Sequence, residues 1–198
     1  MRIIAGIARG RRLAVPKGTA TRPTSDRARE GLFATVAAIR GPLYGARVLD
    51  LFAGSGAIGL EALSRGAARV VFVESDPRAA RVIRANLAAV ALPGGELACD
   101  QVQRFLDRGP GAEAAFGLVV ADPPYAAPVA EVTGMLTALA RGGWLAPGAL
   151  VAVERATRAG PLPWPAGYHA DRSRRYGEAT FWYGLAAAEA SQGKGVTA

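Results

Sequence analysis

The stretch Asp50-Leu51-Phe52-Ala53-Gly54-Ser55-Gly56-Ala57-Ile58-Gly59 decides the fold that we predict for this 198-residue chain. The apolar run 47–52 has the length of a buried strand, and residues 57–65 have the pattern of a helix. Gly54 and Gly56 allow the backbone between them to turn sharply and to approach a ligand closely. A strand, a glycine turn and a helix in this order are typical of a nucleoside site at one edge of an α/β sheet.

Short apolar runs alternate with helical patterns along most of the chain, which favours a mostly parallel sheet covered by helices on both faces. The last two predicted strands have no helix between them and should pair antiparallel. We therefore predict a Rossmann-like α/β fold. Its predicted elements are a β-hairpin within 1–15; helices from a Thr24 or Ser25 cap to Ile39, and over 57–65, 77–90, 101–107 and 127–141; and strands over 47–52, 69–74, 96–99, 117–122, 149–154, 167–173 and 178–185.

The composition indicates one main domain, over 21–185, with a basic N-terminal hairpin arm over 1–20 and a tail over 186–198 that we expect to be disordered. The absence of a long apolar run argues against a membrane span, and the single cysteine favours a cytoplasmic protein. We expect no metal site, because no spacing of Cys, His, Asp and Glu suits one.

The positive charge is concentrated near the N-terminus. Residues 1–47 contain ten Arg and Lys but two acids, which gives this segment the whole chain's net charge of +8. A general preference for Arg over Lys explains the choice of cation but not the scarcity of acids. Such an arm beside a neutral domain favours binding of a nucleic acid.

The glycine turn has the spacing of both dinucleotide sites and S-adenosylmethionine sites. Asp50 favours the second, because a carboxylate suits a cationic ligand and opposes a pyrophosphate. Glu74 ends the next strand, where it could accept hydrogen bonds from the ribose hydroxyls of an adenosine. Asp100 follows the third strand and could accept from the adenine amino group, although a surface acid or a helix cap explains it equally well. The predicted cofactor-binding residues are Asp50, Phe52, Ala53, Gly54, Ser55, Gly56, Glu74 and Asp100.

The turn Asp122-Pro123-Pro124-Tyr125 ends the fourth predicted strand, at the same sheet edge as the glycine turn. An exocyclic amine on a base is a poor nucleophile, because its lone pair is delocalised into the ring. The Asp122 carboxylate and the Pro123 carbonyl could accept its two N–H groups and direct the lone pair at an incoming methyl group. The prolines restrict the backbone of the turn, and Tyr125 could stack on the base. We predict these four residues as catalytic.

Two other methylation chemistries lack the residues they need. Methylation at C5 of a pyrimidine uses a cysteine nucleophile, and Cys99, the single cysteine, has no matching motif; we expect it to be a buried small residue. Methylation of a ribose 2′-hydroxyl commonly uses catalytic lysines, but Lys17 and Lys194 lie in a predicted loop and in the tail.

The chain resembles the RsmD-type 16S rRNA (guanine-N2-)-methyltransferases from residue 1 to about 185. Beyond the two motifs that many amino-methyltransferases share, the resemblance rests on Arg2-Ile3-Ile4-Ala5-Gly6, Arg9-Gly10-Arg11-Arg12-Leu13, Thr21-Arg22-Pro23-Thr24 with Asp26-Arg27 and Arg29-Glu30, Leu32-Phe33, Gly59-Leu60-Glu61-Ala62, Arg175-Tyr176-Gly177 and Phe181. It implies a class I methyltransferase sheet of seven strands, with S-adenosylmethionine as cofactor. It also implies methylation of guanine N2 in 16S rRNA, within the small ribosomal subunit.

The basic arm fits this substrate, because arginines contact phosphates without reading sequence. We predict RNA contacts from Arg9, Arg11, Arg12, Arg22 and Arg27, and nothing in the sequence demands more than a monomer.

Several other functions remain open on the sequence alone. The same chemistry could methylate adenine N6 in DNA or RNA, or a glutamine side chain, although the glutamine enzymes usually carry Asn where this chain has Asp122. The chain could also be a dinucleotide-dependent oxidoreductase, or a non-catalytic RNA-binding assembly factor that keeps the fold.

Overall fold

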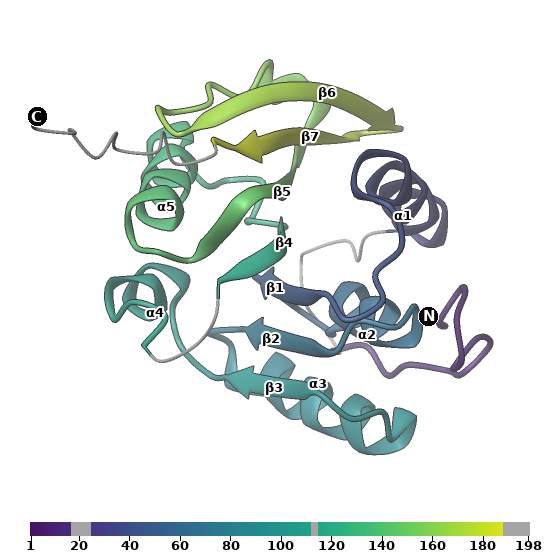
Figure 1. The fold of residues 1–198 in the computed structure, drawn as a ribbon. Coiled ribbons are helices and arrows are strands. Elements are labelled where there is room, and N and C mark those ends of the chain that lie inside the picture. The colour runs from purple at the N-terminus through teal and green to yellow at the C-terminus, as the bar shows by residue number, and fades with distance from the viewer. Residues whose placement is uncertain (17–24, 112–114, 188–198) are drawn as a thin grey trace, which may run out of the picture.

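The computed structural model describes residues 1–16, 25–111 and 115–187, which form a seven-stranded sheet of order β3-β2-β1-β4-β5-β7-β6 (Figure 1). Neighbours from β3 to β5 pair parallel, and β7 pairs antiparallel with β5 and with β6. The strands are β1 (Arg47–Leu51), β2 (Arg69–Val73), β3 (Gly95–Ala98), β4 (Phe116–Ala121), β5 (Leu145–Ala156), β6 (Tyr168–Tyr176) and β7 (Ala179–Ala186). The helices are α1 (Asp26–Arg40), α2 (Ala57–Ser64), α3 (Pro77–Val90), α4 (Val102–Asp107) and α5 (Val129–Arg141), with a short 3₁₀ helix at Thr157–Ala159.

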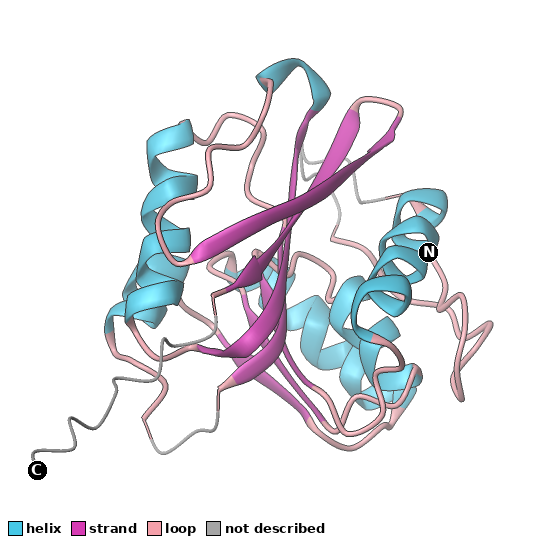
Figure 2. Cartoon of the chain, turned by 45° about the horizontal axis from the view of Figure 1, so that its top comes forward, coloured by secondary structure: helices cyan, strands magenta, loops and turns pink. Residues whose placement is uncertain are grey.

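Helices α1, α2 and α3 cover one face of the sheet, and α4 and α5 cover the other (Figures 1 and 2). Successive residues of a strand point to opposite faces, so that Leu118 packs against the first layer and Val119 against the second. Both faces of the central strands are therefore shielded from solvent, which explains why these strands are almost continuously apolar.

The predicted fold class and order of elements are confirmed, with differences in β5 and in the N-terminal hairpin. Strand β5 begins at Leu145, four residues before the predicted start, and its pairing with β4 shifts register between Phe116 and Leu118. The predicted hairpin is antiparallel, but Arg2 and Arg12 form an isolated bridge rather than part of a regular ladder.

The described part of the N-terminal arm, residues 1–16, packs onto the first helical layer. Its side chains Ile3, Ala8 and Leu13 are buried in the same core as α1 and α2. Glu61 of α2 accepts hydrogen bonds from the N–H groups of Ile4 and Ala5 at 2.7 and 2.9 Å. The arm is thus held by buried contacts along much of its length.

Some predictions lie outside the described residues. These are the loop of residues 17–24, which includes Arg22, and most of the tail, from 188 to 198. Residue 186, which we predicted as the first residue of the tail, is instead the last residue of β7, because its partner Tyr168 continues the ladder. In the described ranges, no helix has both the length and the apolar composition needed to cross a membrane.

Candidate active site

The site lies where the strand order of the sheet reverses, between β1 and β4. Strands β2 and β3 extend from one side of β1, whereas β4 and β5 extend from the other. Adjacent connections therefore leave to opposite faces, and in open α/β sheets the carboxyl ends of two such strands are the usual place for a ligand. The Asp122 N–H donates to the carbonyl of Leu51 at 3.2 Å, which joins the two strand ends. The glycine turn and the 122–125 turn are consequently neighbours, as predicted.

The glycine turn has the backbone conformation that its residues suggest. Gly54 and Gly56 have φ angles of 56° and 75°, in the left-handed region that glycine adopts without strain. Phe52 also has a positive φ, 59°, which costs a bulky residue about 1–3 kcal/mol and is typical of ligand-binding segments. The Ser55 carbonyl accepts from the Asn86 amide of α3 at 2.9 Å, and this contact fixes the turn on the helical layer.

Glu74 connects the end of β2 to the glycine turn. Its carboxylate accepts from the N–H of Gly54 and from the N–H of Asp76, each at 2.8 Å. Each carboxylate oxygen has two lone pairs, so both can still accept a hydroxyl group. Glu74 can therefore hold the turn and bind a ribose at the same time.

Asp50 is buried beneath the glycine turn, with 2% of its surface exposed. Its carboxylate accepts from the Gly59 N–H of α2 at 2.9 Å, and burial raises the pKa of Asp50 to about 8. The hydrogen bond to Gly59 fixes the start of α2. Because Asp50 is almost fully buried, any effect on a bound cation acts through the glycine turn and not by direct contact.

Asp100 follows β3, and its carboxylate is hydrogen-bonded to a backbone N–H group and to an arginine side chain. It accepts from the N–H of Gln101 at 2.8 Å and from the Arg108 guanidinium at 2.6 Å. Desolvation acts to raise the pKa of Asp100, but these hydrogen bonds and the Arg108 charge hold it below its usual value. Its side chain is 15% exposed, and these contacts anchor α4.

The 122–125 turn lies directly after β4, at the carboxyl edge of the sheet. Asp122 is half-buried, Pro123 is buried, and Tyr125 is 46% exposed. The Ala127 N–H donates to the Pro124 carbonyl at 2.8 Å, which closes the turn. Among the described residues, no group donates to the Pro123 carbonyl, so this oxygen can accept a second N–H of an amine.

Tyr125 is anchored by a residue that the sequence analysis did not single out. Its hydroxyl donates to Glu154, a buried residue of β5, at 3.1 Å. Burial and then the Glu154 charge raise the pKa of Tyr125, so the phenol stays protonated and acts as the donor. The available signal was an acid at the end of the apolar run 149–154, on the strand next to the one that carries Asp122.

The whole chain, apart from its last residues, matches one protein family. The family is described as "Conserved hypothetical protein 95", and its sequence model matches residues 1–184. The chain belongs to this family.

Proteins that are similar to this chain in sequence carry methyltransferase names. Ribosomal RNA small subunit methyltransferase D of Escherichia coli K12 is 36% identical over 182 residues, which cover 91% of this chain and 87% of the relative. The protein of the same name from Haemophilus influenzae is 38% identical over 156 residues, 78% of each chain. These findings confirm the predicted family and the predicted methyltransferase activity.

Solved structures agree with the fold. The Escherichia coli protein yhhF has a TM-score of 0.82 and 33% identity, and the match covers 96% of this chain and 99% of that one. A hypothetical protein from Thermus thermophilus has a TM-score of 0.77 and 35% identity, with coverages of 92% and 98%. The class I methyltransferase fold that we predicted is confirmed.

Four of the five predicted RNA-binding arginines lie on the arm or on α1, and Arg22 lies outside the described residues. Arg9, Arg11, Arg12 and Arg27 are exposed, and the Arg11 guanidinium also donates to the carbonyl of Ala89 at 2.8 Å. They are therefore accessible to an RNA backbone.

One minor prediction was wrong. Cys99 is exposed rather than buried, because it lies just beyond the end of β3, where the chain leaves the sheet. No group of three or more His, Cys, Asp and Glu side chains suited to a metal occurs within the described ranges.

Proposed function

We propose that this protein transfers a methyl group from S-adenosylmethionine to the exocyclic N2 amine of a specific guanine in 16S rRNA, within the small ribosomal subunit. The observation that carries the proposal is the direct connection between Asp122 and the end of β1, which brings the catalytic turn beside the glycine turn. The names of the Escherichia coli and Haemophilus influenzae relatives support the substrate.

The glycine turn and the ends of β2 and β3 supply the cofactor site in this proposal. The backbone at Phe52 to Gly56 would lie against the cofactor, Glu74 would accept from the ribose hydroxyls, and Asp100 would face the adenine. Asp50 would hold the turn in place from below. The sulfonium of the bound cofactor supplies an activated methyl group, so the protein's task is positioning.

The turn Asp122 to Tyr125 would bind and orient the amine. The Asp122 carboxylate and the Pro123 carbonyl would accept the two N–H groups of guanine N2, which moves the nitrogen towards tetrahedral geometry. Tyr125, with its hydroxyl fixed by Glu154, would stack on the base and define its plane. Fixed acceptors of this kind lower the barrier because they need no reorganisation during the reaction.

The arm, α1 and the segment between them would hold the RNA backbone, and the contacts would come from Arg9, Arg11, Arg12, Arg22 and Arg27. The proposal treats residues 1–20 as an RNA-binding attachment to a methyltransferase domain over 21–185. It also treats the protein as a cytoplasmic monomer, acting where small subunits are assembled.

The decisive test is incubation of the protein with a methyl-labelled cofactor and undermethylated small subunits, followed by identification of the labelled nucleoside. We expect N2-methylguanosine in 16S rRNA. Labelled N6-methyladenosine would instead support the adenine alternative. Tight RNA binding without any transfer would support a non-catalytic assembly factor.

A further inference from the structure

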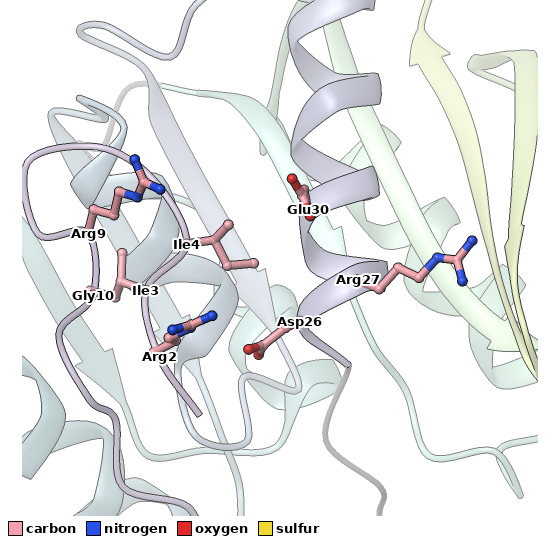
Figure 3. A pocket seen from close by; sticks show the side chains of 8 residues that line it. All are labelled: Arg2, Ile3, Ile4, Arg9, Gly10, Asp26, Arg27 and Glu30. Atoms are coloured by element: carbon pink, nitrogen blue, oxygen red, sulfur yellow. The ribbon is translucent and has the colours of Figure 1, made fainter.

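A cavity of about 380 Å³ lies between the N-terminal arm and the first turns of α1 (Figure 3). Its size is at the lower end of the range of about 300–1,000 Å³ that is usual for small-ligand sites. It contains no residue of the glycine turn or of the 122–125 turn. Its lining residues are Arg2, Ile3, Ile4, Arg9 and Gly10 of the arm and Asp26, Arg27 and Glu30 of α1.

Buried polar groups fix the two walls of this cavity relative to each other. Arg29, which has no exposed surface, donates to the Arg2 carbonyl at 2.6 Å and to the Asp26 carboxylate at 2.9 Å. Glu61, which is equally buried, holds the N–H groups of Ile4 and Ala5. A ligand would therefore enter a site whose backbone is already ordered, which reduces the entropic cost of binding.

The two walls carry opposite charges. Arg2 and Arg9 stand on the arm, whereas Glu30 lies on the side of α1 nearer to Ile4, and Arg27 points away from the arm (Figure 3). Glu30 is exposed, and among the described residues it makes no ion pair or side-chain hydrogen bond, although it belongs to a segment with a net charge of +8. Asp26, in contrast, is occupied by Arg29.

A guanine nucleotide has the chemistry that this arrangement recognises. Guanidinium groups bind its phosphate. A carboxylate can accept from both N1–H and N2–H at the edge of guanine, whereas adenine and cytosine present an acceptor beside their amino group, and uracil presents two acceptors beside its N–H. Ile4 offers an apolar surface for the face of the base.

We propose that this cavity binds a second guanine nucleotide of the RNA substrate, distinct from the one that is methylated. Glu30 accepts hydrogen bonds from the edge of the base, and Arg2 and Arg9 bind its phosphate. The inference rests on the proposed function in taking RNA as the substrate, and it adds a base-reading subsite to an arm that would otherwise contact only phosphates.

Binding can be tested without any methyl transfer. The protein, saturated with S-adenosylhomocysteine and labelled at the methyl groups of its six isoleucines, is titrated with GMP, AMP, CMP and UMP and followed by NMR. We expect GMP to bind most tightly and to shift the Ile4 methyl signal. Glu30→Gln should weaken GMP binding about tenfold, since a bidentate base contact contributes about 1–3 kcal/mol.

Two further variants distinguish this cavity from the catalytic turn, which would also accept a guanine. Arg9→Ala should weaken the GMP-dependent shift of Ile4, whereas Tyr125→Ala should leave it unchanged. A shift that is confined to Ile58, at the start of α2, or that is abolished by Tyr125→Ala, would overturn the proposal.

With small ribosomal subunits as substrate, the direction of the change in KM tests the role of Glu30. Removing a negative charge from a basic surface should, by electrostatics alone, lower the KM for small subunits. If Glu30 accepts base hydrogen bonds, Glu30→Gln should instead raise this KM severalfold with little change in kcat. Glu131→Gln, an equal change at an exposed residue of α5 on the other face of the sheet, is the matched control and should leave KM unchanged (Figure 1).

A KM that is unchanged or lowered in Glu30→Gln would refute the subsite. Failure of the proposed function looks different, because the wild-type protein would then bind GMP at Ile4 yet transfer no methyl group to guanine in small subunits.

Discussion

The Tyr125 hydroxyl donates a 3.1 Å hydrogen bond to the buried carboxylate of Glu154, and this bond ties the turn after β4 to the neighbouring strand β5. Tyr125 is 46% exposed, so part of its ring is accessible while its hydroxyl is held by a buried carboxylate. An aromatic ring that must stack on a mobile base benefits from such a fixed end, because its orientation is then set before the base arrives.

Tyr125→Phe keeps the ring and removes the hydrogen bond, and Tyr125→Ala removes both. We expect kcat to fall a few-fold in Tyr125→Phe and at least tenfold in Tyr125→Ala, since stacking on a base contributes about 1–3 kcal/mol. Steady-state kinetics on small subunits measures both values. If Tyr125→Ala were as active as the wild type, the ring would have no role in positioning the base.

Glu154→Gln tests whether the carboxylate acts through Tyr125. The effects of Glu154→Gln and Tyr125→Phe on kcat should not add in the double variant, because both disturb the same hydrogen bond. Glu154→Gln in the Tyr125→Phe background should therefore cause little further loss. Full additivity would show that Glu154 acts independently of the tyrosine.

Asp122 is the residue on which the proposed chemistry depends most. Asp122→Ala removes one of the two acceptors for the amine, and we expect kcat to fall by about 10²–10³, as when one preorganised group is removed from other enzymes. Asp122→Asn should be similarly impaired, because an amide accepts more weakly than a carboxylate. Binding of RNA and of S-adenosylhomocysteine, measured by calorimetry, should persist, and transfer at the normal rate would refute the assignment.

Glu74 should matter for the cofactor rather than for the RNA. Glu74→Ala removes the acceptor that holds the Gly54 N–H as well as the expected ribose contacts, so we expect the Kd for S-adenosylhomocysteine to rise about 10- to 100-fold. Glu74→Gln keeps an acceptor oxygen and should be less impaired. Isothermal titration gives both values, and Glu131→Gln serves as a control with an equal loss of charge. An unchanged Kd in Glu74→Ala would place the cofactor elsewhere.

The sequence predicted the order of elements well, because the central strands are buried on both faces and so stand out as short apolar runs between glycine-rich turns. It placed the start of β5 too late, since Pro147 and Gly148 are typical of a turn. The chain accommodates them as an irregularity in the pairing of β4 with β5.

The candidate site was only partly predictable. Each of the two motifs directly follows a predicted strand of a parallel sheet, so the glycine turn and the 122–125 turn could be placed at the same edge. A motif, however, locates residues only within its own segment. The Tyr125–Glu154 bond spans 29 residues, and the Glu61 contacts with the arm span more than 50. No local pattern encodes such contacts.

The buried Asp50 should make stability depend on pH. Burial raises its pKa from 3.8 to about 8, so between these values the folded protein holds a proton that the unfolded chain has released. The contribution of Asp50 to stability is therefore complete below about pH 4 and is lost as the pH rises to about 8. Asp50→Asn keeps an acceptor for the Gly59 N–H and should flatten this dependence. Urea unfolding between pH 5 and 8 compares the slopes, and equal slopes in both proteins would contradict the prediction.

Glu61 should be essential for docking of the arm. It accepts from Ile4, Ala5 and the Arg65 guanidinium without any exposure, and Arg29 lies within the reach of its charge. Glu61→Ala leaves these buried donors unpaired, and we expect the free energy of unfolding to fall by about 3–5 kcal/mol. Glu96→Ala, which breaks the more exposed ion pair with Arg69, should cost at most about 1 kcal/mol.

Limited proteolysis adds a readout that is specific to the arm. In the wild type, the N-terminal arm is held by α1 and α2, so cleavage within residues 1–16 should be slow. Glu61→Ala should release the arm and accelerate cleavage there, before the core unfolds, whereas Glu96→Ala should leave the cleavage rate unchanged. Equal cleavage rates in the two variants would mean that the apolar contacts of Ile3, Ala8 and Leu13 hold the arm without help from the buried carboxylate.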